Sequence, residues 1–544
     1  IPSSVSDIKE SVFEECTSLE RIVIPSTVIN LGDNICKNCT SLKSADILVR
    51  YIRNYVFYGC SSLTSVNFSS SVESIGNYNF KNCTSLVDIE LPSSIKYFGG
   101  NFDGCTSLKN VVLPPTEYIS SFRECSSLTH IKIPSSVKII CRDTFEGCSS
   151  LVNVEIPQSV TSIGQSSFKG CSSLTSIEIP SSVTTIESIA FAECSSLATV
   201  KLDASITVLE FFTFKGCSSL KSIKIPSTVT EIKDKVFYDC SSLTHVEIPS
   251  SVTFIGNESF EKCKSLTSIE LPPNLTSIEK HLFRECSSLT SIKIPSSVTS
   301  INDSAFSNCK SLVSIEIPSS VTLIGNGSFY SCSELSSIKL PSSLEKIGSS
   351  AFYYCISLKS IKIPKSVSFI GNSAFYGCKL VESIEIPSLV TSIEDETFYS
   401  CSELSSIKLP SSLEKIGSSA FYYCESLKSI EIPNSVSFIG NSAFLSCKSL
   451  ESIEIPSSVT KIESETFAFC KIKDIKIPMS VTIIESKAFL YCSELTSIVI
   501  PKSVKIIGEN AFNGCSKLET IKLPSSINVD SLAIDPDTKI ERID

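Results

Sequence analysis

A fixed repeat is the feature of this sequence that most restricts its fold. Cysteine recurs every 23 residues from Cys125 to Cys470 without interruption, and the units aligned on it read C-x-x-L-x-x-I-x-I-P-S-S-V-x-x-I-x-x-x-x-F-x-x. A period of roughly 20 to 50 residues is typical of stacked repeat architectures. A block of 24 residues, Cys332 to Cys355, occurs again letter for letter from Cys401 to Cys424, which indicates that whole turns were duplicated. The period therefore predicts a solenoid rather than several globular domains.

Within one turn, apolar and polar residues alternate around Ile292 and Ile294. This period of two is typical of a short strand with one buried face, and Pro295 ends the strand because it has no N–H to donate. The return path carries the apolar residues Val298, Ile301 and Phe306. We predict a β-dominated, right-handed coil with one long parallel sheet on one face and short turns or 3-10 segments on the other.

The repeat extends over almost the whole chain. It predicts one continuous solenoid of about 23 turns over residues 1–524, with irregular turns within 36–125, where some cysteine spacings are 20, 21 or 22 residues. Residues 525–544 depart from the pattern, and we expect them to cap the last open edge. Because Ile1 falls within a repeat, we expect the natural chain to begin earlier, so that any export signal would precede it.

The fullest repeats carry the pattern L-x-x-I-x-I-P-x-S-V-x-x-I-G-x-x-A-F-x-x-C, as in Leu174 to Cys194, Leu335 to Cys355 and Leu404 to Cys424. This pattern resembles the leucine-rich repeats of BspA-like proteins, and the resemblance covers nearly the whole chain. It implies a leucine-rich repeat solenoid. It also implies display at a cell surface or in the extracellular space, with adhesion to host proteins or to other cells.

Charge and composition argue against several classes of protein. The chain has 57 acidic and 47 basic residues and a net charge of −10, so it offers no basic stripe for nucleic acid. No stretch of 18 apolar residues would span a membrane. Only three histidines occur, and no phosphate-binding glycine loop or H-E-x-x-H motif is present. We therefore expect no enzyme activity, no cofactor and no metal site.

Cysteine is unusually abundant, with 25 residues, of which 23 occupy one slot per turn. Free cysteine behaves as a small buried hydrophobe, so this slot predicts a structural thiol ladder. Its regular part comprises Cys171, Cys194, Cys217, Cys240, Cys263, Cys286, Cys309, Cys332 and Cys355. Neighbouring rungs lie close enough for scattered disulfides, although parallel side chains argue against a disulfide framework. Cys36 replaces the usual Phe and Cys141 the usual Gly; the single C-x-x-C of Cys36 and Cys39 lacks the partners of a zinc site.

The exposed face of the predicted sheet carries a column of mixed charge, in the slot held by Lys293. Opposite signs follow one another in most steps, which predicts either a self-neutralised solvated face or a surface for self-association. His130 and His245 interrupt a neighbouring column of Ser, five turns apart.

The irregular stretch ILVRYIRNYVFYGC near the start combines residue types that are typical of protein contacts. We predict partner binding there by Arg50, Tyr51, Arg53, Tyr55 and Tyr58, with His130 as a further contact residue. The alternative is neutral drift of repeats near the end of the chain.

Tyrosines also gather directly before cysteine in the second half of the chain. They are Tyr330, Tyr353, Tyr354, Tyr376, Tyr399, Tyr422, Tyr423 and Tyr491. Their rings either pack between turns or form a row that contacts a partner.

Two functions fit the sequence. The first is a non-enzymatic, protein-binding solenoid displayed at a cell surface for adhesion. The alternative is an intracellular scaffold, in the cytoplasm or the cytoskeleton, which many unpaired thiols and the missing export signal favour. In both cases the partner is a protein of unknown identity.

Overall fold

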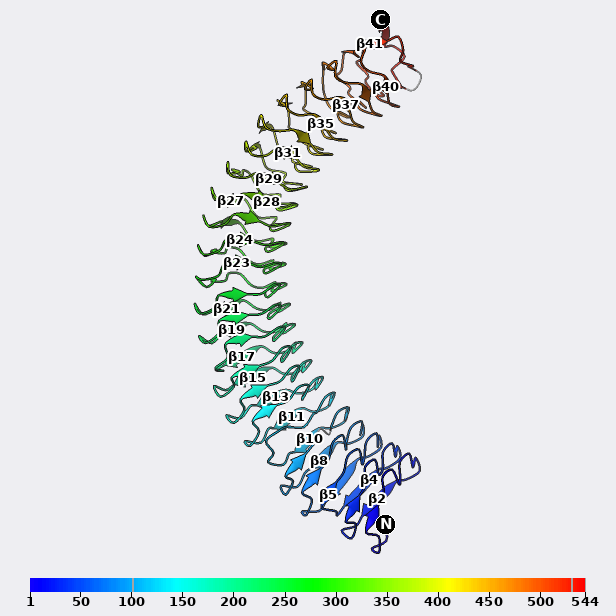
Figure 1. Cartoon of the computed structure of the whole chain (residues 1–544), viewed down its shortest axis with the longest axis vertical. Coiled ribbons are helices and arrows are strands. Elements are labelled where there is room, and N and C mark those ends of the chain that lie inside the picture. Colours follow the sequence, from blue (N-terminus) through cyan, green and yellow to red (C-terminus); the bar gives the residue numbers. More distant parts are fainter. Residues whose placement is uncertain (100–101, 530–531, 544) are drawn as a thin grey trace. The chain divides into compact units, whose positions relative to one another are not determined.

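The structure is a computed structural model and describes residues 1–99, 102–529 and 532–543. The chain forms two compact units, Ile1–Leu266 (unit 1) and Thr267–Asp544 (unit 2), and each is considered by itself. In each unit successive turns stack one upon the next (Figure 1). The described residues contain strands of two to five residues and turns, and no helix. The predicted parallel β-solenoid is confirmed.

Most turns contribute one strand to a first parallel ladder, built from the segment between Leu and Pro of the repeat. In unit 1 these strands are β2 (Arg21–Ile24), β4 (Ser44–Ile47), β6 (Ser65–Phe68), β8 (Asp88–Glu90), β10 (Asn110–Val112), β11 (His130–Lys132), β13 (Asn153–Glu155), β15 (Ser176–Ile179), β17 (Thr199–Leu202), β19 (Ser222–Lys224) and β21 (His245–Glu247). In unit 2 they are β25 (Ser314–Glu316), β27 (Ser337–Lys339), β30 (Ser383–Glu385), β32 (Ser406–Lys408), β34 (Ser429–Ile430), β36 (Ser452–Ile453), β39 (Ser497–Val499), β41 (Thr520–Pro524) and β42 (Lys539–Ile543).

Strands of the first ladder pair in register with the equivalent residues of the next turn. In β15 and β17, Ile177 lies opposite Val200 and Glu178 opposite Lys201. In β15 and β19 buried and exposed residues alternate, as the sequence predicted.

A second parallel ladder runs along another side of each unit, where the sequence predicted turns or 3-10 segments. Its unit 1 strands are β1 (Asp7–Ile8), β3 (Asn30–Leu31), β5 (Tyr51–Ile52), β7 (Ser74–Ile75), β9 (Tyr97–Phe98), β12 (Ile139–Ile140), β14 (Ser162–Ile163), β16 (Thr185–Ile186), β18 (Val208–Leu209), β20 (Glu231–Ile232) and β22 (Phe254–Ile255). In unit 2 they are β23 (Ser277–Ile278), β24 (Ser300–Ile301), β26 (Leu323–Ile324), β28 (Lys346–Ile347), β29 (Phe369–Ile370), β31 (Ser392–Ile393), β33 (Lys415–Ile416), β35 (Phe438–Ile439), β37 (Lys461–Ile462), β38 (Ile483–Ile484) and β40 (Ile506–Ile507).

The return path has the predicted turns, and the second ladder adds two-residue strands that the sequence did not predict. Two residues per turn are too few to show a period in the sequence. They form strands because the adjacent turn presents the same backbone in register, so each N–H finds a carbonyl there.

The turn segment that leads into each cysteine is also hydrogen-bonded to the next turn. Ser350, Phe352 and Tyr354 donate their backbone N–H to the carbonyls of Asn372, Ala374 and Tyr376, at 2.8, 2.8 and 2.7 Å. Ser350 and Tyr354 adopt positive φ values of 54°, and nearly every turn repeats this at the same two slots. A non-glycine residue in the left-handed backbone conformation destabilises the fold by roughly 1–2 kcal/mol. The hydrogen bond that each such residue donates to the next turn offsets this cost.

Phenylalanine rings form the centre of the core in both units. In unit 1 the rings from Phe57 to Phe260 stack at centroid distances of 5.1–5.9 Å. In unit 2 the rings from Phe283 to Phe512 stack at 5.4–5.8 Å. The predicted core residues of one turn are buried, with 0% exposure at Val298, Ile301 and Phe306.

All nine cysteines of the predicted thiol ladder are free and fully buried. Cys194 and Cys332 donate their thiols to the carbonyls of Phe168 and Phe306, both at 3.1 Å. Burial raises the pKa of the Cys332 thiol to about 12, so it stays protonated and unreactive at neutral pH.

The predicted C-terminal cap adds one more strand to the first ladder of unit 2. β42 pairs in parallel with β41, and the Arg542 guanidinium donates to the carbonyls of Pro524 and Ile527 at 3.1 and 2.7 Å. Residues 530–531 and 544 of this segment lie outside the described residues. The predicted continuity of the solenoid from one unit to the other stays a prediction.

Candidate functional site

Five tyrosines in unit 2 form a stack along one edge of the turns, which we name the tyrosine ladder. Its members are Tyr330, Tyr353, Tyr376, Tyr399 and Tyr422, one from each of five consecutive turns. Their ring centroids lie 4.7, 4.4, 4.4 and 4.6 Å apart, with planes within 16° of parallel. The rings are partly buried, so the predicted packing between turns is confirmed.

Unit 2 also carries a set of more exposed aromatic side chains, which we name the aromatic row. The row consists of Tyr354, Tyr423, Phe469 and Tyr491, each directly before a cysteine. They are 40%, 38%, 41% and 50% exposed. Large aromatic side chains with this much exposed surface are typical of protein contacts.

Ring contacts fix the side chains of the row, and two of its rings contact the ladder. Tyr354 meets Tyr353 edge-on at 4.8 Å and 84°, and Tyr423 meets Tyr422 at 4.5 Å and 73°. Both pairs belong to the duplicated block, so the duplication built the same arrangement twice. Phe469 and Tyr491 stack on each other at 5.0 Å.

Small residues in the next turn make room for two of these rings. A Cβ atom on Gly377 would lie 2.7 Å from Cδ1 of Tyr354, and one on Gly514 would lie 2.3 Å from Cδ1 of Tyr491. These rings therefore lie against the glycine backbone on one side and face solvent on the other.

Burial is the main influence on the pKa of four phenol groups of the ladder. It raises the pKa of Tyr353, Tyr376 and Tyr399; at Tyr353 the phenols of Tyr330 and Tyr354 and the Glu396 carboxylate act in the same direction, whereas the hydrogen bond with Tyr376 opposes them. Burial, followed by the adjacent Tyr423, raises the pKa of Tyr422 to about 12. These four phenols are therefore neutral at physiological pH and can act as hydrogen-bond donors and acceptors.

The predicted partner-binding residues of unit 1 fall into separate groups. Arg50 lies 5.5 Å above the ring of Tyr51, next to β5, and Arg53 follows that strand. Tyr55 and Tyr58 lie in the turn segment, 5.9 Å apart, and Tyr55 stacks on Tyr78 at 5.3 Å. Within the described residues, no hydrogen bond, ion pair or ring contact joins Arg50 or Tyr51 to Tyr55 or Tyr58.

His130 lies apart from both groups, on β11 of the first ladder. It is exposed, and its Nδ1 lies 3.0 Å from the hydroxyl of Thr129. Its predicted role in partner binding stays a prediction.

The mixed-charge column of the first ladder forms ion pairs between turns. Pairs include Lys224–Glu247 at 2.9 Å, Glu316–Lys339 at 2.6 Å and Glu385–Lys408 at 2.8 Å, all with side chains more than half exposed. The column neutralises itself, which supports the interpretation of a solvated face.

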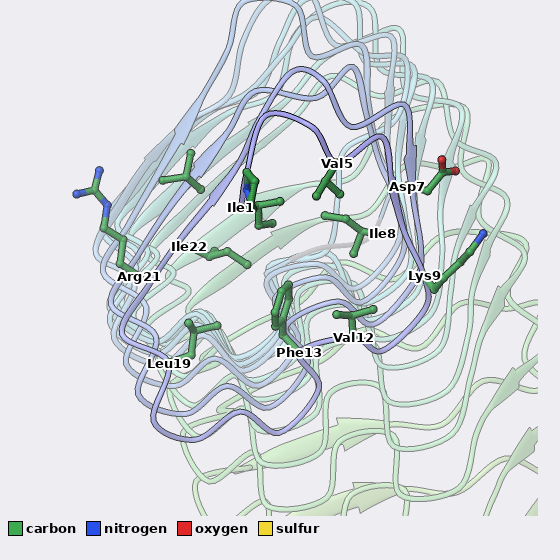
Figure 2. A pocket seen from close by; sticks show the side chains of 12 residues that line it. Ile1, Val5, Asp7, Ile8, Lys9, Val12, Phe13, Leu19, Arg21 and Ile22 are labelled. Carbon is green, nitrogen blue, oxygen red and sulfur yellow. The ribbon is translucent and has the colours of Figure 1, made fainter.

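One cavity of about 570 Å³ lies at the N-terminal edge of unit 1 (Figure 2). Figure 2 shows Val5, Ile8 and Phe13 around its centre, whereas Lys9 and Arg21 point away. The lining is apolar core surface of the first turns, without the convergent polar groups of a catalytic site.

The described part of the chain shows neither a metal cage nor a membrane helix. It contains no group of three or more His, Cys, Asp or Glu side chains arranged to hold a metal ion. The interaction between the neighbouring thiols of Cys36 and Cys39 raises the pKa of Cys36 and lowers that of Cys39. No helix long and apolar enough to cross a membrane occurs among these residues.

Comparison with protein families identifies the repeats. The family model for the BspA type leucine rich repeat region matches seven overlapping ranges, 1–109, 48–152, 138–267, 253–382, 322–449, 370–496 and 482–533. The chain belongs to the BspA-type leucine-rich repeat family. The resemblance inferred from the repeat pattern is confirmed.

Solved structures of bacterial leucine-rich repeat proteins are similar to this chain. A leucine-rich repeat protein from Bacteroides ovatus is 27% identical, over 87% of this chain and 88% of that one, with a TM-score of 0.32. A leucine rich cell surface protein from Faecalibacterium prausnitzii is 31% identical, over 59% of this chain and 87% of that one, with a TM-score of 0.38. No curated protein matches the chain.

Two features of the aromatic row were not predicted from the sequence. Phe469 was not grouped with the tyrosines, although it directly precedes Cys470 as Tyr354 precedes Cys355. The left-handed backbone of the slot was also missed, because polar, charged and aromatic residues occupy it as well as Gly. Reading the slot as a column, across chemical types, would have found Phe469.

Proposed function

We propose that this BspA-type solenoid is a non-enzymatic, protein-binding molecule displayed at a cell surface, where it mediates adhesion. The observation that carries the proposal is the aromatic row of unit 2, with four side chains that are 38–50% exposed. Its rings are held by edge-on and stacked contacts, so they lose little conformational freedom when a partner covers them. The surface location rests on the family to which the chain belongs.

Adhesion is tested with beads coated with the purified chain and applied to a monolayer of mucosal epithelial cells. The row variant carries Tyr354→Ser and Tyr423→Ser. The control carries Glu124→Ser and Glu193→Ser in the same slot of unit 1, where both residues also have positive φ. We expect about tenfold fewer attached row-variant beads, because aromatic anchors dominate such interfaces. Equal attachment of the two variants would contradict the role of the row.

Surface display is tested separately, by antibody labelling of intact and permeabilised cells of the source organism. We expect labelling of intact cells. Labelling that requires permeabilisation would reject the surface location, while adhesion in the bead assay would still support protein binding.

An intracellular scaffold is the second candidate, and the thiol ladder favours it. The free thiols serve as donors to backbone carbonyls, a chemistry that persists in a reducing compartment. The intact mass of protein from its natural source, before and after reduction and alkylation, tests this. An unmodified chain with 25 alkylatable thiols would favour the scaffold, whereas disulfides or attached sugars would favour the secretory route.

A further inference from the structure

A second surface, in unit 1, combines exposed tyrosines with an excess of positive charge. We name it the tyrosine–arginine face; it comprises Arg50, Tyr51, Arg53, Lys96, Tyr97 and Tyr118. It lies along the second ladder, where Tyr51 begins β5, Tyr97 begins β9 and Tyr118 bridges to Ile139. The three tyrosines are 50%, 53% and 55% exposed.

The pairing register separates the first two rings by one small residue. Tyr51 pairs with Ser74, and Ser74 pairs with Tyr97, so the two tyrosines stand two rungs apart. At the strand spacing of a sheet this is roughly 10 Å. We name the interval between the two rings, over Ser74, the notch; on its far side the Tyr97 hydroxyl donates to Oδ1 of Asn77 at 3.4 Å, in the turn that carries Ser74.

Arg53 occupies a slot in which both neighbouring turns have glycine. Gly32 and Gly76 hold the equivalent positions, each directly after the corresponding strand, so no side chain stands beside Arg53 in its slot. The residue is exposed and forms no ion pair within the described part of the chain. In another turn Glu463 occupies this slot, and its side chain pairs at 2.9 Å with that of Lys461, the strand residue two positions earlier. Arg53 follows Tyr51 by the same two positions.

The other cations of the face are only partly neutralised. Arg50 pairs with Glu73, and the same carboxylate lies 3.6 Å from Lys96, so two cations share one anion. Their side chains are 60% and 78% exposed.

The sign of the face is opposite to that of the whole molecule. Its cations are Arg50, Arg53 and Lys96, with Lys138 exposed in the next turn along. Its carboxylates are Glu73, Glu117 and Asp33, whose Oδ1 accepts the Asn54 N–H next to Arg53 at 2.9 Å. Four positive groups against three negative ones leave a small excess of positive charge here, in a chain whose net charge is −10. Such a local field favours a negatively charged partner.

We propose that the tyrosine–arginine face docks an extended acidic segment of a partner protein. A carboxylate of that segment pairs with the Arg53 guanidinium, whose planar donors match a carboxylate in two hydrogen bonds. The backbone of the segment crosses the notch over Ser74, and its apolar atoms cover Tyr51 and Tyr97. This face lies in the other unit from the aromatic row, so the inference would stand even if the adhesion proposal failed.

The test measures the fluorescence anisotropy of a labelled synthetic peptide in which Glu alternates with Ala, titrated with the full chain at low salt. The variant is Arg53→Gln. The matched control is Lys233→Gln, which removes one positive charge from the same slot of unit 1, where the lysine already pairs with Glu231. We expect Arg53→Gln to weaken binding about tenfold and Lys233→Gln less than about twofold.

Other outcomes overturn the inference. Equal weakening by the two variants would mean that the peptide responds to net charge alone. Binding of a peptide with Gln in place of Glu would remove the role of the carboxylate. A third outcome is that the chain binds heparin more tightly than the acidic peptide, with Arg53→Gln weakening only the binding of heparin. That result would assign the face to a sulfated polysaccharide. Thermal unfolding of both variants at the wild-type temperature is the control for folding.

Discussion

The turns of the two units have the same backbone conformation but differ in the side chains that precede the cysteines. In unit 1, Lys169 pairs with Glu146 at 3.0 Å in the slot two residues before cysteine, and the following slot holds Gly170. In unit 2 the corresponding slots hold Tyr376 of the tyrosine ladder, 4.4 Å from Tyr353, and exposed aromatics such as Tyr423. The hydrogen bonds between turns are the same in both units. The backbone is therefore fixed by the repeat, and these two slots remain free to acquire a surface chemistry.

The first prediction concerns what the units have in common. Phe168→Ala in unit 1 and Phe329→Ala in unit 2 each remove a fully buried ring stacked between two others. We expect each to lower the free energy of unfolding by about 3–5 kcal/mol, because both leave a cavity in a packed core. Urea denaturation measures this. A small loss in only one unit would show that the two cores differ, contrary to the structure.

The second prediction separates backbone strain from ring packing. Gly170 and Gly377 both have φ near 70°, but a Cβ would lie 3.8 Å from its nearest neighbour at Gly170 and 2.7 Å from Tyr354 at Gly377. We expect Gly170→Ala to destabilise by about 1 kcal/mol and Gly377→Ala by about 2–3 kcal/mol, because only the latter displaces a ring. Urea denaturation of the two variants side by side gives the difference. Equal values would mean that Tyr354 moves without cost.

The third prediction compares a stacked ring with an ion pair. Tyr399 stacks on both sides, at 4.4 and 4.6 Å, so Tyr399→Ala should lower the free energy of unfolding by about 2 kcal/mol. The Lys169 side chain is 37% exposed, so Lys169→Ala should lower the free energy of unfolding by less than about 1 kcal/mol. Urea denaturation at high salt should abolish the Lys169 effect and leave the Tyr399 effect unchanged. Salt sensitivity of both would argue against stacking as the source of stability in unit 2.

The fourth prediction uses pH to reveal the tyrosine ladder. The pKa of Tyr422 rises from 10.0 to about 12, so the folded state holds its proton in a range where the unfolded state releases it. The stability from this group is therefore fully present below pH 10 and is lost as the pH rises through 12. Unfolding of the wild type and of Tyr422→Phe, measured across this range, should differ increasingly as the pH rises. A constant difference would contradict the raised pKa.

Much of the architecture could be predicted from the sequence because it depends on a period. The thiol ladder and the first strand ladder follow from residues such as Cys332 and Ile292, whose slots recur in every turn. The candidate sites were harder to predict. Tyr51 and Tyr55 are neighbours in sequence, yet one lies at the second ladder and the other in the turn segment, because the chain turns between them. Tyr51 and Tyr97 are distant in sequence but share a face, since parallel pairing brings alternate turns into one register.

The sequence by itself determined that this protein is a solenoid of stacked turns, because burying the repeated Leu, Ile and Phe requires a neighbour of the same kind. It also determined the family and the free-thiol slot. Only the tertiary structure decided which polar and aromatic residues stand together on a surface. The second ladder and the left-handed slots form through hydrogen bonds to the next turn, and no local propensity encodes those bonds. The aromatic row and the tyrosine–arginine face exist because stacking converts a separation along the chain into a short distance in space.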